Sequence, residues 1–93
     1  MLANFHALLA RGDAGGAAAL LQRAPGLANA RSLKDGETPL HAAVRAKSLP
    51  LVQLLVGAGA DARAVDREGR TPAEAAAADG AAGMAAWLSR RAE

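Results

Sequence analysis

The segment GETPLHAA at residues 36–43 is repeated, in part, as GRTPAEAA at residues 69–76. The two copies begin at Gly36 and Gly69, and Leu54-Leu55 and Trp87-Leu88 keep the same offset. A fixed period of this length indicates an array of similar units, each too small to bury its apolar face alone. We therefore expect a repeat architecture.

The residues around Thr38 and Thr71 predict helix starts. A threonine at the position before a helix can accept a hydrogen bond from a free backbone N–H, and proline is favoured at the first helical position. Glu74 follows Thr71 at the spacing of a capping box. The pattern predicts first helices over 39–46 and 72–79, second helices over 50–56 and 82–90, and an earlier pair over 2–11 and 14–23. Residues 23–27 are expected to form a turn with a small insertion.

The segment TPLHAA at positions 38–43 matches the T-P-L-H-x-A signature of the ankyrin repeat, and the offset between Gly36 and Gly69 equals the ankyrin period. Gly59-Ala60-Asp61 matches the turn that follows the family's second helix, and the core of that helix corresponds to Leu49, Val52, Leu54 and Leu55. The terminal units match less well, as capping repeats do. The resemblance implies an all-α ankyrin-repeat solenoid of three stacked helix-turn-helix units with β-hairpin-like finger loops. It would form a single domain over 1–93, with units of approximately 1–33, 34–66 and 67–93.

Composition narrows the functional classes. The net charge is +2, and acids and bases are interspersed rather than gathered into the basic stripe of a nucleic-acid binder. No apolar run approaches membrane-spanning length, and the N-terminus does not resemble a signal peptide. The chain has no cysteine, which suits a reducing compartment. We expect a cytoplasmic protein without nucleic-acid or membrane partners. The excess of arginine over lysine and the abundance of alanine suggest a bacterial genome.

His41 is the strongest candidate for chemistry. The resemblance implies instead that it ties the helix start to the neighbouring hairpin, and a hydrogen-bonded buried group is the usual state of such a residue. His6 is interpreted as a partly exposed polar residue on a capping helix. The sequence has no H-E-x-x-H motif and no phosphate-binding loop. We therefore predict no cofactor, no metal and no enzymatic activity.

The resemblance implies a non-catalytic protein–protein interaction module that binds through its finger loops and its concave first-helix face. Mapped onto this sequence, the partner-binding residues are Lys34, Asp35, Glu37, Arg45, Ala46, Arg67, Glu68, Arg70, Ala78 and Asp79. The charges on the fingers have no evident role in folding. Two alternatives remain: a structural or assembly segment of a larger protein or homo-oligomer, and a small ligand-binding protein or enzyme.

Two features of the sequence leave alternatives open. Trp87 aligns with Leu54, which favours a core position, but a partly exposed aromatic anchor would also fit. The nearly apolar run over 81–88 could leave a hydrophobic face, so we expect a monomer, with self-association through the C-terminal end as the alternative. Lys47 stands where the family places a glycine, and Gly80 keeps that glycine in the next unit.

Overall fold

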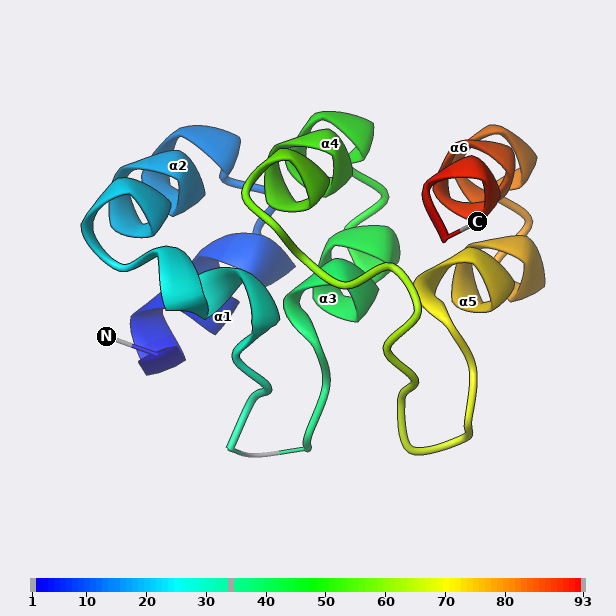
Figure 1. The fold of residues 1–93 in the computed structure, drawn as a ribbon, viewed down its shortest axis with the longest axis horizontal. Helices are drawn as coiled ribbons and strands as arrows, with labels where there is room; N and C mark the ends of the chain where they lie inside the picture. The colour runs from blue at the N-terminus through cyan, green and yellow to red at the C-terminus, as the bar shows by residue number, and fades with distance from the viewer. Residues whose placement is uncertain (1, 34, 93) are drawn as a thin grey trace.

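The computed structural model describes residues 2–33 and 35–92, and these form three antiparallel helix pairs without a strand. The pairs are α1 (Leu2–Ala10) with α2 (Ala14–Arg23), α3 (Pro39–Arg45) with α4 (Leu49–Gly57), and α5 (Pro72–Ala78) with α6 (Ala82–Ala92). Figure 1 shows α1, α3 and α5 in one layer, α2, α4 and α6 in the other, and two loops projecting from the first layer. The all-α prediction is confirmed.

The helix ends lie within two residues of the predicted ones. The helices α1, α3 and α5 each end one residue early, because Ala46 and Asp79 serve as C-caps and Arg11 lies in a turn. The turn predicted over residues 23–27 is formed largely by a short 3-10 helix, η1 (Pro25–Asn29), which buries Leu27.

The predicted helix starts are confirmed in detail. The Thr38 hydroxyl accepts a hydrogen bond from the backbone N–H of His41 at 3.2 Å. Thr71 accepts from the N–H of Glu74 at 3.2 Å, while the Glu74 carboxylate accepts from the N–H of Thr71 at 2.8 Å. This reciprocal pair is the capping box. Because both starts are fixed by local side chains, the first-layer helices begin at equivalent points along the stack.

The core runs between the two layers, and α4 contributes Leu51, Val52 and Leu55 to it. The expectation for Leu49 and Leu54 was wrong, since both are only half-buried. At 3.6 residues per turn, Leu51, Val52 and Leu55 fall in one sector of the helix, and Leu49 and Leu54 lie on either side of that sector.

The C-terminal helix α6 turns its apolar face inward. Met84 and Leu88 are buried, so these two side chains do not form the exposed hydrophobic face that the sequence left open as an alternative. Trp87 is half-buried rather than a core residue, and the Arg91 guanidinium lies 4.4 Å from the centre of its ring. Among the described residues, the exposed large apolar side chains are Leu33 and Val65, on the projecting loops.

Candidate functional site

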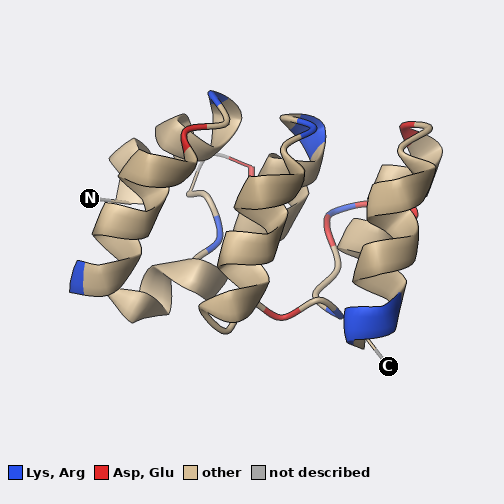
Figure 2. Ribbon diagram, turned by 90° about the horizontal axis from the view of Figure 1, so that it is seen from above, with Lys and Arg blue, Asp and Glu red and all other residues tan. Residues whose placement is uncertain are grey.

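The two projecting loops are the predicted fingers. We call residues 30–33 and 35–38 the first finger and residues 62–71 the second finger. The backbone N–H of Asp66 donates to the carbonyl of Arg70 at 2.9 Å, and the N–H of Ser32 donates to that of Glu37 at 2.9 Å. These bonds close each loop in the manner of a hairpin. Figure 2 shows that charged residues are concentrated on loops and helix ends and that most of the helix surface carries none.

The carboxylates of Asp66 and Asp35 accept hydrogen bonds from backbone N–H groups of the fingers. The Asp66 carboxylate accepts hydrogen bonds from the backbone N–H groups of Glu68 at 3.0 Å and Arg70 at 2.9 Å. Burial opposes ionisation of Asp66, but those N–H groups and the nearby His41 and Arg70 outweigh it and lower the pKa of Asp66. A hydrogen bond from the backbone N–H of Glu37 similarly lowers the pKa of Asp35. Both carboxylates are therefore ionised at neutral pH.

His41 joins α3 to the second finger. Its Nε2 lies 2.8 Å from the carbonyl oxygen of Arg70, and a carbonyl can only accept, so Nε2 carries the proton. The other ring nitrogen, Nδ1, is within hydrogen-bonding distance of the Thr38 hydroxyl. Since both nitrogens are engaged and the side chain is 2% exposed, His41 is held as a structural tie, as the resemblance implied. His6 makes a similar tie from α1, donating through Nε2 to the carbonyl of Ala30 at 2.7 Å.

Two further ties between units were not found from the sequence. Arg31 donates to the carbonyl of Gly36 within the first finger at 3.0 Å and to that of Val65 in the second finger at 2.9 Å. The Asn29 side chain accepts from the N–H of Asp61 at 2.7 Å. No local pattern signalled these roles, because Val65 and Asp61 belong to the next unit along the chain.

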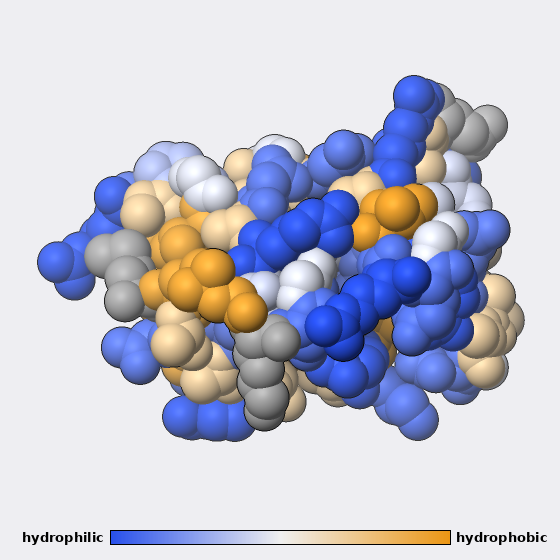
Figure 3. Space-filling view, turned by 90° about the horizontal axis from the view of Figure 1, so that it is seen from below, coloured by the Kyte–Doolittle hydropathy of each residue, from blue (hydrophilic) through white to orange (hydrophobic). Residues whose placement is uncertain are grey.

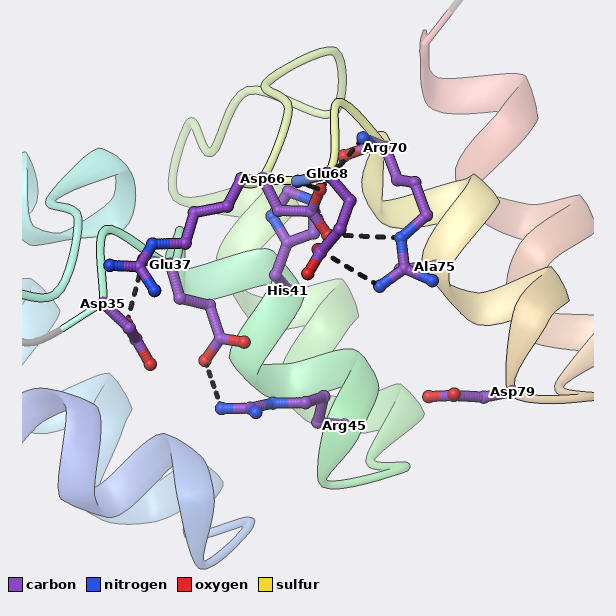
Figure 4. Close-up of a pocket in the computed structure, with 10 residues that line it drawn as sticks. Asp35, Glu37, His41, Arg45, Asp66, Glu68, Arg70, Ala75 and Asp79 are labelled. Atoms are coloured by element: carbon purple, nitrogen blue, oxygen red, sulfur yellow. Dashed lines mark hydrogen bonds and ion pairs between the residues drawn. The ribbon is translucent and has the colours of Figure 1, made fainter.

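The fingers and the first-layer helices enclose a groove, drawn in Figure 4. Its deeper part, between the fingers and α3 and α5, has a volume of about 250 Å³ and is lined by Asp35, Glu37, His41, Arg45, Asp66, Arg67, Glu68, Arg70, Ala75 and Asp79. A hollow of about 580 Å³ adjoins it between α1 and α3. The two parts share Asp35, Glu37 and Arg45 among their lining residues and therefore lie side by side, and we refer to them together as the groove.

Most of the predicted site residues come together in this groove. Seven of them line the deeper part, and Ala46 lines the adjoining hollow. Ala78 is exposed and lines neither part. Lys34 lies outside the described residues.

The finger charges were expected to have no role in the fold, but Asp35 accepts a backbone hydrogen bond, and Glu37, Glu68 and Arg70 form ion pairs. Glu37 and Arg45 form an ion pair at 2.7 Å, and Arg70 pairs with Asp66 at 3.4 Å and Glu68 at 3.5 Å. Exposed pairs of this kind contribute about 0–1 kcal/mol each. Arg67 and Asp79 also line the groove, and neither belongs to these pairs.

The described residues contain no cluster of three or more His, Cys, Asp or Glu side chains that could hold a metal ion. None of the helices over 2–33 and 35–92 is both long enough and apolar enough to cross a membrane.

The sequence profile of ankyrin repeats, in three copies, matches residues 5–93. The chain therefore belongs to the ankyrin-repeat family, whose members are generally non-enzymatic modules for protein–protein interaction.

Relatives of known name match over part of the chain. Diacylglycerol kinase iota of Mus musculus and of Homo sapiens is 43% identical over 58 residues, which is 62% of this chain and 6% of the kinase. The Neurogenic locus Notch protein of Drosophila melanogaster is 45% identical over 62 residues, which is 67% of this chain and 2% of that protein. The chain thus spans only a small part of the length of these relatives.

Proposed function

We propose that this protein binds another protein, without catalysis, through its two fingers and the first-layer helices α1, α3 and α5. The observation that carries the proposal is the convergence of fingers and helices on one groove, which has a charged part and an alanine-lined part. Small molecules are usually held in mostly apolar pockets with a few placed polar groups, whereas the part of the groove drawn in Figure 4 is lined mainly by charged side chains.

The ties between units support this function. His41, Arg31 and Asn29 each fasten one unit to the next, and Arg63 fastens the second finger to the carbonyl of Ala92 at 2.6 Å. A groove fixed in this way needs little ordering when a partner arrives, so less of the binding free energy is lost. The site would therefore bind as a largely preformed surface.

We also propose that the binding unit is a monomeric domain over residues 1–93, divided near residues 33 and 66. The inward-facing Met84 and Leu88 support this, because they leave little apolar surface on α6 for a second copy.

The test compares two double variants with the same change in net charge. Arg67→Ala with Asp79→Ala removes one charge of each sign from the groove and leaves the ion pairs of Arg45 and Arg70 in place. Arg23→Ala with Asp61→Asn is the control, because both residues are exposed and lie outside the groove. Surface changes of this kind usually shift stability by no more than about 0.5 kcal/mol, so both variants should fold.

A partner is first isolated by capture on the immobilised wild-type chain, and its Kd for each variant is then measured by calorimetry. We expect the groove variant to bind about tenfold more weakly or worse, equivalent to about 1.4 kcal/mol, and the control to bind like wild type. Equal affinities for all three proteins would contradict binding in the groove.

A further inference from the structure

The groove differs in charge from the rest of the protein. The chain as a whole carries a net charge of +2. The described side chains that line the two parts of the groove include five carboxylates and three guanidinium groups, a net charge of −2 with the histidines neutral. Since a concave surface of one sign attracts ligands of the other, the groove favours a basic ligand even though the protein is basic.

The carboxylates of the groove differ in how far their charge is already compensated. Glu37, Asp66 and Glu68 are paired with Arg45 or Arg70. Asp35 belongs to none of these pairs, although the backbone N–H of Glu37 and the charges of Arg45 and Arg67 lower its pKa. Asp79 is exposed at the end of α5 and also stands outside these pairs.

Asp35 and Asp79 are placed to meet one occupant. Asp35 is half-buried on the first finger, and Asp79 follows α5 in the next unit. Figure 4 shows the two on opposite sides of Arg45, so an occupant of the groove would pass both. They are therefore the carboxylates through which the groove can select a basic ligand.

The part of the groove next to α1 combines alanines with the polar side chains of His6, Ser32, Asp35, Glu37 and Arg45. Its walls carry Ala3, Ala7 and Ala10 from α1 and Ala42 and Ala46 from α3, which we call the alanine trough. Methyl side chains fill little space, which leaves the hollow of about 580 Å³ open. Figure 3, which looks at the molecule from below Figure 1, shows that this face carries both apolar and strongly hydrophilic residues. Asp35 lines both the alanine trough and the deeper part of the groove.

We propose that the occupant of the groove is a peptide segment of another protein that contains an apolar residue and Lys or Arg residues. The apolar residue lies beside α1, and the basic residues lie nearer to α5. The apolar side chain occupies the alanine trough, one basic side chain meets Asp35, and a second meets Asp79. The proposal rests on the proposed function, because it names the chemistry of the partner that this same groove takes. Burial of the apolar residue supplies affinity, and the two carboxylates select the charge.

The test selects ligands without bias. A phage-displayed library of random linear peptides is panned against the immobilised full chain, and the enriched peptides are synthesised with a fluorescent label. We expect enrichment of sequences that combine Lys or Arg with Leu, Ile, Val or Met, and depletion of Asp and Glu. Affinities measured by fluorescence anisotropy should fall as salt is raised, because the contacts are between exposed charges.

Matched variants locate the binding. Asp35→Asn with Asp79→Asn should weaken the selected peptides about tenfold. The control, Asp13→Asn with Asp61→Asn, removes the same charge outside the groove and should have little effect, since asparagine keeps the oxygens that accept backbone N–H groups there. Ala7→Gln should obstruct the trough and weaken binding, whereas Ala19→Gln on the exposed surface of α2 should not.

The outcomes separate the two proposals. Acidic or uncharged peptides whose binding is lost in the Ala7→Gln or the Asp35/Asp79 variant would overturn the basic-peptide proposal and leave the groove as a binding site. Basic peptides that lose as much affinity in the Asp13/Asp61 control as in the groove variant would show general charge attraction and overturn it too. Selected peptides that bind every variant like wild type would contradict both proposals.

Discussion

Lys47 occupies a backbone conformation that usually requires glycine. Its φ is 57°, and the equivalent turns of the other two units use Gly12, with φ of 71°, and Gly80, with φ of 78°. A residue with a Cβ loses about 1–2 kcal/mol in this region. Lysine thus tolerates the turn between α3 and α4 at a cost, which answers the question that the sequence left open about this position.

Replacing Lys47 by glycine should stabilise the protein. We expect Lys47→Gly to raise the free energy of unfolding by up to about 1 kcal/mol, because the relief of strain exceeds the extra entropy of the unfolded chain. Urea denaturation measures the change. Gly80→Ala is the reverse control and should destabilise through the backbone alone, since no atom lies within 4 Å of the added Cβ. A neutral or destabilising Lys47→Gly would show that the turn is not strained.

Asp66 should make the protein sensitive to acid. Its pKa is lowered in the folded state from an ordinary value of 3.8, so its contribution to stability is complete above that value and is lost as pH falls through the lower folded pKa. We expect Asp66→Asn to reduce the dependence of unfolding free energy on pH between about pH 5 and the acid limit. The measurement is a series of urea denaturations at stepped pH. An unchanged slope in the variant would contradict the role given to this carboxylate.

At the scale of the element, α4 shows what the sequence could and could not predict. The residues with core character were clear, but the face that points inward was not, because α4 is apolar at nearly every position. An apolar run of this kind has no strong periodicity from which to choose a face. The starts of α3 and α5 were predictable, in contrast, because Thr38 and Thr71 form their caps with residues close by in the sequence.

The burial of α4 predicts different costs for two adjacent leucines. Leu55 is 0% exposed, so Leu55→Ala should cost about 2–5 kcal/mol. Leu54 is half-buried, and Leu54→Ala should cost clearly less because less apolar surface is lost and solvent can fill the gap. Thermal and urea denaturation of the two variants measures the difference. Equal losses would mean that the inward face of α4 is assigned wrongly.

At the scale of the whole molecule, the fixed period of the sequence predicted an array of similar units, and the resemblance to ankyrin repeats implied that these units are stacked helix pairs. The groove depended on more than the period. The residues between the fingers, α3 and α5 were largely predictable from the family resemblance, because equivalent positions of successive units face the same side. The α1 residues that line the other part of the groove were not among the predicted site residues. The pairing of its charges was not predictable, since Glu37 meets Arg45 from another element, and the fingers are held by ties that cross between units.

The same stacking explains why the groove has two chemical halves. The α1 side of the groove is walled by alanines, while the side between α3 and α5 is walled by the charged second finger. Each unit therefore contributes its own surface, and the stack fixes their order along the groove. A partner would be recognised by the order of its apolar and charged residues along the groove as well as by their number.

The most direct test of binding in the groove is to map the contact surface by NMR. The ¹⁵N-labelled chain is titrated with a ligand captured on the wild-type protein, and the backbone amide shifts are followed residue by residue. We predict that the largest changes fall on the two fingers and on α1, α3 and α5, including Ala7, Arg45 and Asp79. Changes confined to α2, α4 and α6, with the fingers unaffected, would contradict the account.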